Sequence, residues 1–226
     1  MGMLSNQIAD LIEGAFEVPG FEDDDLPSGI VGRYNQGKDG SLNSHPDTVE
    51  GVCIALAMKW LDCKVNGSDF WKSCLSGKAL NAQTLSFVQE TMSALARSPG
   101  GHGRLDIIRG IANQAGIAPF VSAAKGPPLW SGGECGQRGA DVVSELWSRS
   151  AHAIIGLKPP YGKPGDGHAI GFASGTKSCW IFDPNFGEIR LASMSVATEV
   201  FAALWKKKGY DHLTQFDITR YHPSLK

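Results

Sequence analysis

The sequence predicts an α+β fold, with helices in its N-terminal half and an antiparallel sheet in its C-terminal half. Apolar residues recur at helical spacing in five segments, residues 5–16, 51–62, 81–98, 103–116 and 140–150. From residue 152 onward, short β-rich runs separated by turn residues replace them: HAIIGLK, HAIGFAS, CWIFDP and EIRLAS. Because helices and strands are segregated along the chain, an antiparallel sheet is favoured over alternating βαβ units.

The N-terminal segment is expected to lie apart from the main domain. Residues 5–16 carry apolar side chains on one helical face, whereas residues 17–49 are rich in Gly, Pro and Asp and have no periodicity. The second stretch is therefore predicted to be a long loop or flexible arm. The resulting division is an N-terminal helix and arm over residues 1–45, followed by one domain over residues 46–226.

The remaining elements follow from local signals. A short helix is predicted over residues 68–77 and is ended by Gly77. Residues 118–139 contain several Gly and Pro and are predicted to form a loop. A helix over residues 195–209 carries lysines in its last turn, where they suit the helix dipole, and residues 212–221 are predicted to be the closing strand.

The composition fits one globular domain of ordinary size. The chain has 226 residues, of which 42% are hydrophobic and 19% are charged, and its net charge is −2. A net charge this small gives no electrostatic reason to expect nucleic acid or an anionic membrane as a partner. No stretch approaches the roughly 20 apolar residues of a membrane span. The N-terminus also lacks the basic region and apolar core of a Sec signal.

The five cysteines show no spacing that is typical of a disulfide framework or a zinc site. Their number is odd, and the sequence contains no CxxC pair and no zinc-like Cys–His spacing. A reducing compartment is therefore expected, with no metal and no other cofactor. Cys63, Cys74 and Cys179 lie in apolar runs and are expected in the core, whereas Cys135 lies in a Gly-rich loop.

Cys53 differs from the other cysteines because it lies at the predicted start of a helix, in the segment EGVCIALAMKWLD. The backbone N–H groups and the dipole at a helix N-terminus favour the thiolate, which is the nucleophilic form of cysteine. A buried cysteine is otherwise a small hydrophobic residue without chemistry. Whether Cys53 is a nucleophile or a core residue depends on whether the chain supplies a base and a group that orients the base.

The β-rich half supplies both groups in one predicted hairpin. His168 opens the strand in DGHAIGF, and Asp183 ends the strand in WIFDPNFGE. A turn centred on Gly175 and Thr176 would place His168 directly opposite Asp183. Cross-strand Cβ atoms lie about 4.5–5.5 Å apart, which lets a carboxylate accept a hydrogen bond from an imidazole. Both faces of the hairpin are largely apolar, so its strands are predicted to lie inside the sheet, covered on both sides.

His152 is the main rival of His168 as the base, because AHAIIG and GHAIGF both open predicted strands. His152 closely follows a helix and has no acidic residue at a matching cross-strand position. A catalytic base is recognised by its orienting partner, so His168 is preferred. The other histidines are expected in loops or at the surface: His45, His102, His212 and His222.

A helix-start cysteine, a strand-start histidine and a strand-end aspartate, in that chain order, describe the papain-like arrangement. The segments EGVCIALAMKWL around Cys53, GHAIGF around His168 and FDPNFGE around Asp183 resemble the YopT/AvrPphB family of effector cysteine proteases, which bacteria deliver into host cells. The resemblance spans residues 50–190, including the long gap before the histidine. It implies a papain-like cysteine protease fold with a helical N-terminal lobe, a C-terminal antiparallel β-sheet and an active site in the cleft between them.

The second donor of the oxyanion hole is less clear from the sequence. Papain-like enzymes usually supply it from an Asn or Gln side chain a few residues before the cysteine, but Asp47 and Thr48 occupy those positions here. The backbone N–H of Cys53 is expected to be one donor, and Thr48 is the candidate for the other.

The resemblance implies a thiol hydrolase that cuts a host protein at one or a few sites. Cys53 would attack the carbonyl carbon, His168 would move the proton, and Asp183 would orient the imidazole. The source would be a bacterium that makes the protein in its cytoplasm and delivers it, as a secreted virulence effector or toxin, through a dedicated secretion system. The implied partners are a protein or peptide substrate, a secretion chaperone, and an inhibitor or immunity protein.

Other activities use the same scaffold and stay open at this point. A papain-like amidase of the NlpC type acts on peptidoglycan in cell-wall hydrolases and antibacterial toxins, although this chain shows no cell-wall-binding repeat. An acyltransferase or a glutamine deamidase would use the same Cys–His arrangement. The absence of Asn or Gln just before Cys53 also leaves open a catalytically inert interaction protein.

Overall fold

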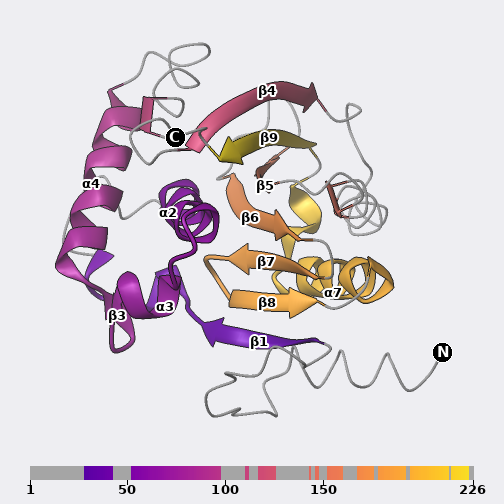
Figure 1. Cartoon of the computed structure of the whole chain (residues 1–226), viewed down its shortest axis with the longest axis horizontal. Coiled ribbons are helices and arrows are strands. Elements are labelled where there is room, and N and C mark those ends of the chain that lie inside the picture. The colour runs from indigo at the N-terminus through magenta and orange to yellow at the C-terminus, as the bar shows by residue number, and fades with distance from the viewer. Residues whose placement is uncertain are drawn as a thin grey trace.

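Helices cover both faces of a seven-stranded antiparallel sheet (Figure 1). The structure, a computed structural model, describes residues 28–42, 52–97, 110–111, 117–125, 143, 146–147, 152–159, 167–175, 178–191, 194–213 and 215–223. Within these ranges, helices dominate the N-terminal half and strands the C-terminal half. The predicted α+β class is therefore confirmed.

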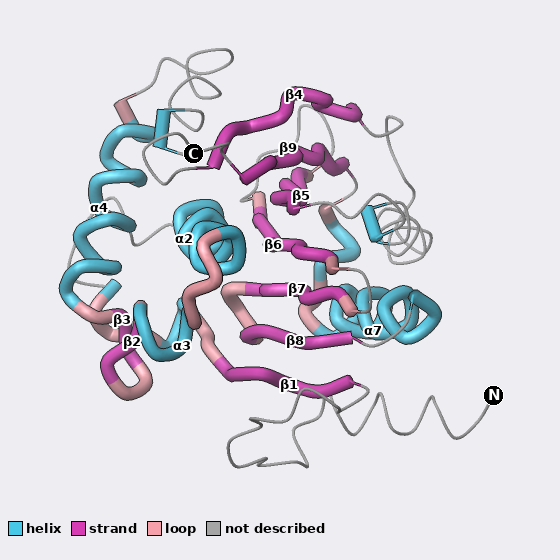
Figure 2. The backbone as a smooth tube through the Cα atoms, in the orientation of Figure 1, coloured by secondary structure: helices cyan, strands magenta, loops and turns pink. Residues whose placement is uncertain are grey.

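The main sheet has the strand order β1-β8-β7-β6-β5-β9-β4 (Figure 2). Its strands are β1 (Ser28–Arg33), β4 (Ile117–Lys125), β5 (His152–Lys158), β6 (His168–Ser174), β7 (Cys179–Asp183), β8 (Gly187–Leu191) and β9 (Gln215–Pro223). A separate two-stranded sheet pairs β2 (Leu75–Ser76) with β3 (Ala79–Leu80). Every pairing between described strands is antiparallel, as predicted.

The helices lie in two groups on opposite sides of the sheet (Figure 1). The α-helices are α2 (Cys53–Val65), α3 (Phe70–Ser73), α4 (Ala82–Ala96) and α7 (Met194–Lys207), and the 3₁₀ helices are η1 (Gln36–Lys38) and η5 (Tyr210–His212). Helices α2, α3 and α4 gather on one side, and α7 lies on the other. This arrangement places α2, which begins with the predicted nucleophile, against the strands that carry the predicted base.

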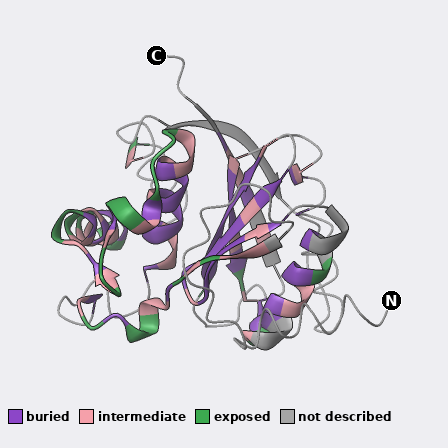
Figure 3. Cartoon of the chain, turned by 60° about the horizontal axis from the view of Figure 1, so that its bottom comes forward, coloured by how far each residue is buried: buried purple, intermediate pink, exposed green. Residues whose placement is uncertain are grey.

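Two apolar cores fill the space between the sheet and these helices. One face of β6 and β7 contributes Phe172 and Ile181 to the core under α7, and the other face contributes Ala173 and Phe182 to the core under α2. Strand β6 is buried along its whole length. Much of the strand surface in Figure 3 is likewise coloured as buried. The prediction that both hairpin strands lie inside the sheet and are covered on both sides is confirmed.

Close packing on the sheet fixes the position of α2. The Trp60 ring stacks on Phe182 of β7, with ring centroids 5.5 Å apart and an angle of 8° between the planes. Trp60 also covers Gly171 of β6, where an added Cβ atom would lie 2.6 Å from the indole ring. Glycine at position 171 therefore permits the close approach, and a larger residue there would displace the helix that carries Cys53.

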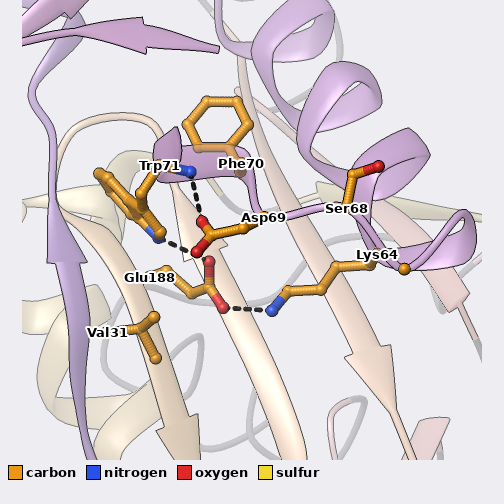
Figure 4. A pocket seen from close by; sticks show the side chains of 8 residues that line it. Val31, Lys64, Ser68, Asp69, Phe70, Trp71 and Glu188 are labelled. Carbon is orange, nitrogen blue, oxygen red and sulfur yellow. Dashed lines mark hydrogen bonds and ion pairs between the residues drawn. The ribbon is translucent and has the colours of Figure 1, made fainter. Parts of the chain in front are cut away.

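A buried carboxylate ties the C-terminal end of α2 to the sheet (Figure 4). Glu188 of β8 accepts hydrogen bonds from the indole nitrogens of Trp60 (2.8 Å) and Trp71 (3.0 Å). It also forms an ion pair with Lys64, and only 1% of its surface is exposed. A buried charge is tolerated where such partners replace water, so this cluster holds α2 and α3 in place over β8.

The flexible-arm interpretation of residues 17–49 is wrong for part of that stretch. Residues 28–33 form β1, which pairs with β8, and the pairing contains an irregularity between Ile30 and Gly32. This strand lies at the edge of the sheet, and its short, glycine-containing sequence carries little strand signal of its own. The predicted boundary between residues 45 and 46, like the helix expected over residues 5–16, falls outside the described residues and stays a prediction.

Two further expectations need correction. Residues 118–139 were expected to form a loop, but residues 117–125 form β4, the opposite edge strand, where Pro119 is tolerated because one edge of the strand needs no partner. The helix expected over residues 68–77 ends at Ser73, and the β2–β3 hairpin follows, with Gly77 in the left-handed region at φ 65°.

Candidate active site

Cys53 lies at the open N-terminal end of α2. Helices α3 and α4 are capped by their own side chains, Asp69 and Asn81, whereas the N-cap residue of α2 is Val52, which makes no side-chain cap. The first N–H groups of a helix have no partner within it, and they carry the positive end of the helix dipole. The half-buried Cys53 thiol therefore lies where a negative charge is stabilised.

His168 and Asp183 are in direct contact at the ends of β6 and β7. Nε2 of His168 lies 2.9 Å from Oδ1 of Asp183, and the side chains are 6% and 0% exposed. The predicted contact between these two residues is therefore present. In such a buried site water cannot compete for the hydrogen bond, so the carboxylate restricts the orientation of the imidazole.

The register that brings His168 and Asp183 together differs from the predicted one. Ser174 pairs with Cys179, two residues beyond its predicted partner, and the N–H of Gly175 donates to the carbonyl of Ser178. The two residues are consequently diagonal neighbours and not directly opposite each other. A displacement of two residues keeps both side chains on one face of the sheet, which preserves the contact despite the wrong register.

The Cys53 side chain lies near enough to the imidazole of His168 to raise its pKa. Burial alone would lower the pKa of His168, but the charge and hydrogen bond of Asp183, together with the Cys53 contact, raise it to about 10. Burial would raise the pKa of Asp183, but the imidazolium and the hydrogen bonds lower it below the ordinary value. The arrangement thus favours a charged imidazolium–carboxylate pair beside the cysteine at neutral pH.

Tyr210, which the sequence analysis did not single out, completes the hydrogen bonding of this pair. Its hydroxyl lies 2.9 Å from Oδ2 of Asp183 and 3.0 Å from Nε2 of His168. Its ring stacks on the imidazole, with centroids 4.7 Å apart. Tyr210 begins η5, directly after the left-handed Gly209. The sequence marks the end of a helix there, but no local signal shows that this tyrosine returns to the sheet beside His168.

Asn185, in the turn between β7 and β8, supports the same group from the other side. Its backbone N–H donates to Oδ1 of Asp183 (2.8 Å), and its side-chain amide donates to the hydroxyl of Tyr210 (3.1 Å). Lys208 in turn donates to the carbonyl of Asn185 (2.7 Å). Asp183 therefore accepts bonds from an imidazole, a phenol and a backbone amide, which together hold it in one position.

The other predicted residues lie elsewhere or outside the described chain. His152 is half-buried, begins β5 and pairs with Ala173 near the end of β6. Because the strands are antiparallel and His168 begins β6, the two histidines lie at opposite ends of this strand pair. The expected core cysteines are confirmed as buried: Cys63, Cys74 and Cys179. Thr48 and Cys135 lie outside the described residues.

A pocket of about 330 Å³ lies at the other end of α2, around Glu188, Lys64 and Trp71 (Figure 4). It is therefore separated from Cys53 by the length of the helix. Among the described residues, no group of three or more His, Cys, Asp or Glu is arranged to hold a metal ion. In the same part of the chain, no helix is both long and apolar enough to cross a membrane.

The fold and the geometry around Cys53 define a class of protein. Papain-like cysteine peptidases combine a thiol at a helix N-terminus with a histidine held on an antiparallel sheet. The sequence agrees, since residues 30–224 match the family model Peptidase_C58, described as Yersinia/Haemophilus virulence surface antigen. The chain belongs to this family of cysteine peptidases, the YopT/AvrPphB family.

Several solved structures are similar to this chain. The Pseudomonas avirulence protein AvrPphB is 18% identical with a TM-score of 0.51, and the match covers 79% of this chain and 95% of AvrPphB. The YopT domain of the Pasteurella multocida PfhB2 toxin is 20% identical (TM-score 0.38; 83% and 90% covered). PatoxP, a cysteine protease-like domain of the Photorhabdus asymbiotica toxin PaTox, is 12% identical (TM-score 0.38; 85% and 53% covered). No curated protein sequence matches. The likeness to AvrPphB confirms the papain-like fold.

Proposed function

We propose that this peptidase is an effector protease that cleaves a host protein with Cys53, His168 and Asp183 as its catalytic triad. The observation that carries the proposal is the buried His168–Asp183 contact of 2.9 Å beside the thiol at the start of α2. A nucleophile, a base and an orienting carboxylate within hydrogen-bonding reach of one another are the requirements of covalent acyl transfer.

The geometry accounts for each step of peptide hydrolysis. The Cys53 sulfur attacks the carbonyl carbon while its proton resides on His168, and the carbonyl electron pair moves onto oxygen. The imidazolium then donates its proton to the leaving amine, which breaks the C–N bond and leaves a thioester on Cys53. His168 next takes a proton from water, which hydrolyses the thioester and restores the free cysteine. Asp183 holds one imidazole orientation and balances the imidazolium charge throughout.

The proposed host substrate and delivery rest on the family. The description of the matching family model names a virulence surface antigen, and the structural neighbour AvrPphB is an avirulence protein. We therefore place this protein with bacterial effectors that act in a host or target cell after delivery by a dedicated secretion system. A secretion chaperone and an inhibitor or immunity protein stay predicted partners. Thr48 stays a predicted, untested oxyanion donor.

Mass spectrometry of cleavage products tests the proposal. Host-cell lysate and purified peptidoglycan are each incubated with the wild-type protein and with Cys53→Ala, and new protein N-termini and released muropeptides are identified. The proposal predicts new N-termini in one or a few host proteins with the wild type alone. Release of muropeptides would instead indicate a cell-wall amidase, and identical product profiles for both proteins would indicate an inert scaffold.

A further inference from the structure

We propose that Gln36 is the side-chain donor of the oxyanion hole, a role that rests on the proposed protease function. The sequence offered Thr48 as the donor from the segment just before Cys53, whereas Gln36 lies much earlier, in the η1 turn after β1. The folded chain brings it to the start of α2, because its side-chain oxygen Oε1 accepts a hydrogen bond of 3.3 Å from the backbone N–H of Val52.

This hydrogen bond sets the direction of the Gln36 amide. A backbone N–H can only donate, so the oxygen of the amide faces Val52 and the Nε2 amino group, on the same carbon, is left to donate elsewhere. Val52 directly precedes Cys53, and its carbonyl accepts a hydrogen bond from the N–H of Leu56. The Gln36 amide thus contacts the residue next to Cys53, and in the proposed site its amino group and the Cys53 N–H are the two donors at this helix end.

The backbone of Gln36 is tied to the other half of the active site. Its N–H donates to the carbonyl of Pro184 at 2.8 Å, and Pro184 follows Asp183 directly. Gln36 thus connects the helix of the nucleophile with the turn that directly follows the orienting carboxylate of Asp183. A donor held from both sides can keep its position while the reaction proceeds, which is what stabilisation of a developing charge requires.

The turn that carries Gln36 is itself rigidly supported. The Asn35 side chain caps η1 by accepting from the N–H of Gly37 (3.0 Å). On its other side, the 4% exposed Asp39 accepts hydrogen bonds from the hydroxyl of Tyr34 (2.9 Å) and the N–H of Leu80 (3.0 Å). The side chain of Gln36 is therefore presented by a fixed turn and not by a free loop.

The proposed role explains why the N-cap residue of α2 is Val52, whose side chain makes no cap. During attack, the carbonyl π electrons move onto oxygen, and the resulting oxyanion accepts hydrogen bonds from Cys53 N–H and Gln36 Nε2. A Ser, Asp or Asn cap at position 52 would compete for the first-turn N–H groups. Loss of one oxyanion donor costs about 10²–10³ in turnover in a serine protease.

Two reactions of the same thiol separate this role from a structural one. Acylation of Cys53 by p-nitrophenyl acetate passes through an oxyanion, whereas alkylation by iodoacetamide does not. Gln36→Glu keeps the oxygen that faces Val52 but removes the donor, and Gln36→Met removes the amide without adding charge. Lys38→Ala, an exposed residue of the same turn, is the matched control. Alkylation is followed over pH, so that plateau rates of the fully ionised thiol are compared, and folding is checked by thermal melting.

The proposal predicts that both Gln36 variants lose at least tenfold in acylation rate while their plateau alkylation rates stay within about twofold of wild type. Lys38→Ala should match the wild type in both reactions. Unchanged acylation in Gln36→Met, or an equal loss of both reactions in the two variants, would overturn the role of Gln36. If wild-type Cys53 is not acylated at all, the proposed protease function fails, and the role of Gln36 fails with it.

Discussion

The two ends of α2 each face a buried carboxylate from the sheet, and the two sites differ in what that carboxylate contacts. At the N-terminal end, Asp183 of β7 is fully buried and contacts His168, which reaches the Cys53 thiol. At the C-terminal end, the 1% exposed Glu188 of β8 contacts Lys64 and Trp71 (Figure 4) and also the indole nitrogen of Trp60.

The difference shows that burial of a carboxylate does not by itself indicate catalysis. Lysine and tryptophan do not change protonation near neutral pH, so Glu188 can only hold α2 and α3 on the sheet. Histidine can gain and lose a proton during a reaction, and it lies beside a nucleophile. The partner therefore decides the role: Asp183 serves the proposed chemistry, and Glu188 serves the fold.

Replacing the base should have the largest effect. His168→Ala should abolish peptide turnover, because no group remains to accept the Cys53 proton or to protonate the leaving amine. His152→Ala is the matched control, since His152 begins the neighbouring antiparallel strand and lies at the opposite end of the strand pair from His168. Turnover of the peptide found in the lysate experiment is measured for folded protein. An equal loss of turnover in both variants would contradict the assignment of His168, and not His152, as the base.

Asp183→Asn should keep the fold and reduce turnover by a large factor, since the corresponding change in a serine protease costs about 10⁴. The pH profile should change as well. Asp183 helps to raise the pKa of His168 to about 10, so the alkaline limb of kcat/KM should lie near that pH in the wild type. Without the carboxylate charge, the limb should move toward the ordinary histidine value of about 6.5. An unchanged limb would mean that Asp183 does not set the charge of His168.

Tyr210→Phe should have a smaller effect, because the ring that stacks on His168 stays and only the hydroxyl is lost. Loss of one hydrogen bond to a charged group costs about 1.5–3 kcal/mol when it is fully used, and Asn185 still holds Asp183. We expect kcat to fall roughly tenfold with KM unchanged. A rise in KM at constant kcat would point instead to a role in binding the substrate.

Glu188→Gln should leave turnover unchanged well below the unfolding temperature and should destabilise the fold. The amide oxygen of Gln can still accept from the indole nitrogens, so the loss of the ion pair with Lys64 should lower the free energy of unfolding by about 2 kcal/mol, measured by urea denaturation. Lys72→Met, which removes an exposed pair with Asp69, should cost at most about 1 kcal/mol. A loss of turnover in folded Glu188→Gln would contradict the purely structural role of this end of α2.

Central strands were easier to predict from the sequence than edge strands. The bounds of β5 and β6 agree with the apolar runs HAIIGLK and HAIGFAS, because strands buried on both faces need continuous apolar residues. Edge strands β1 and β4 were missed, since each pairs on one side only and tolerates Gly and Pro.

In the site, the contact between His168 and Asp183 was predictable from strand alternation, even though the turn length was not. The residues 174–178 are all common in turns, so the sequence allowed more than one register, but a shift of two leaves the faces unchanged. Tyr210 and Gln36 could not be found in this way. Their contacts with the site depend on how distant elements pack, and their own sequence neighbourhoods show only a helix end and a loop.

Competitive alkylation of the folded protein distinguishes a catalytic Cys53 from a merely acidic thiol elsewhere. Contact with Cys63 lowers the pKa of Cys74 to about 7, but Cys74 is only 1% exposed, whereas Cys53 is half-buried and lies near His168, whose pKa it helps to raise. Limiting iodoacetamide near pH 6, followed by peptide mass spectrometry, should show Cys53 modified first in the wild type and more slowly in His168→Ala. Faster modification of Cys74 or any other cysteine, or a Cys53 rate that does not depend on His168, would contradict the assignment of Cys53 as the nucleophile.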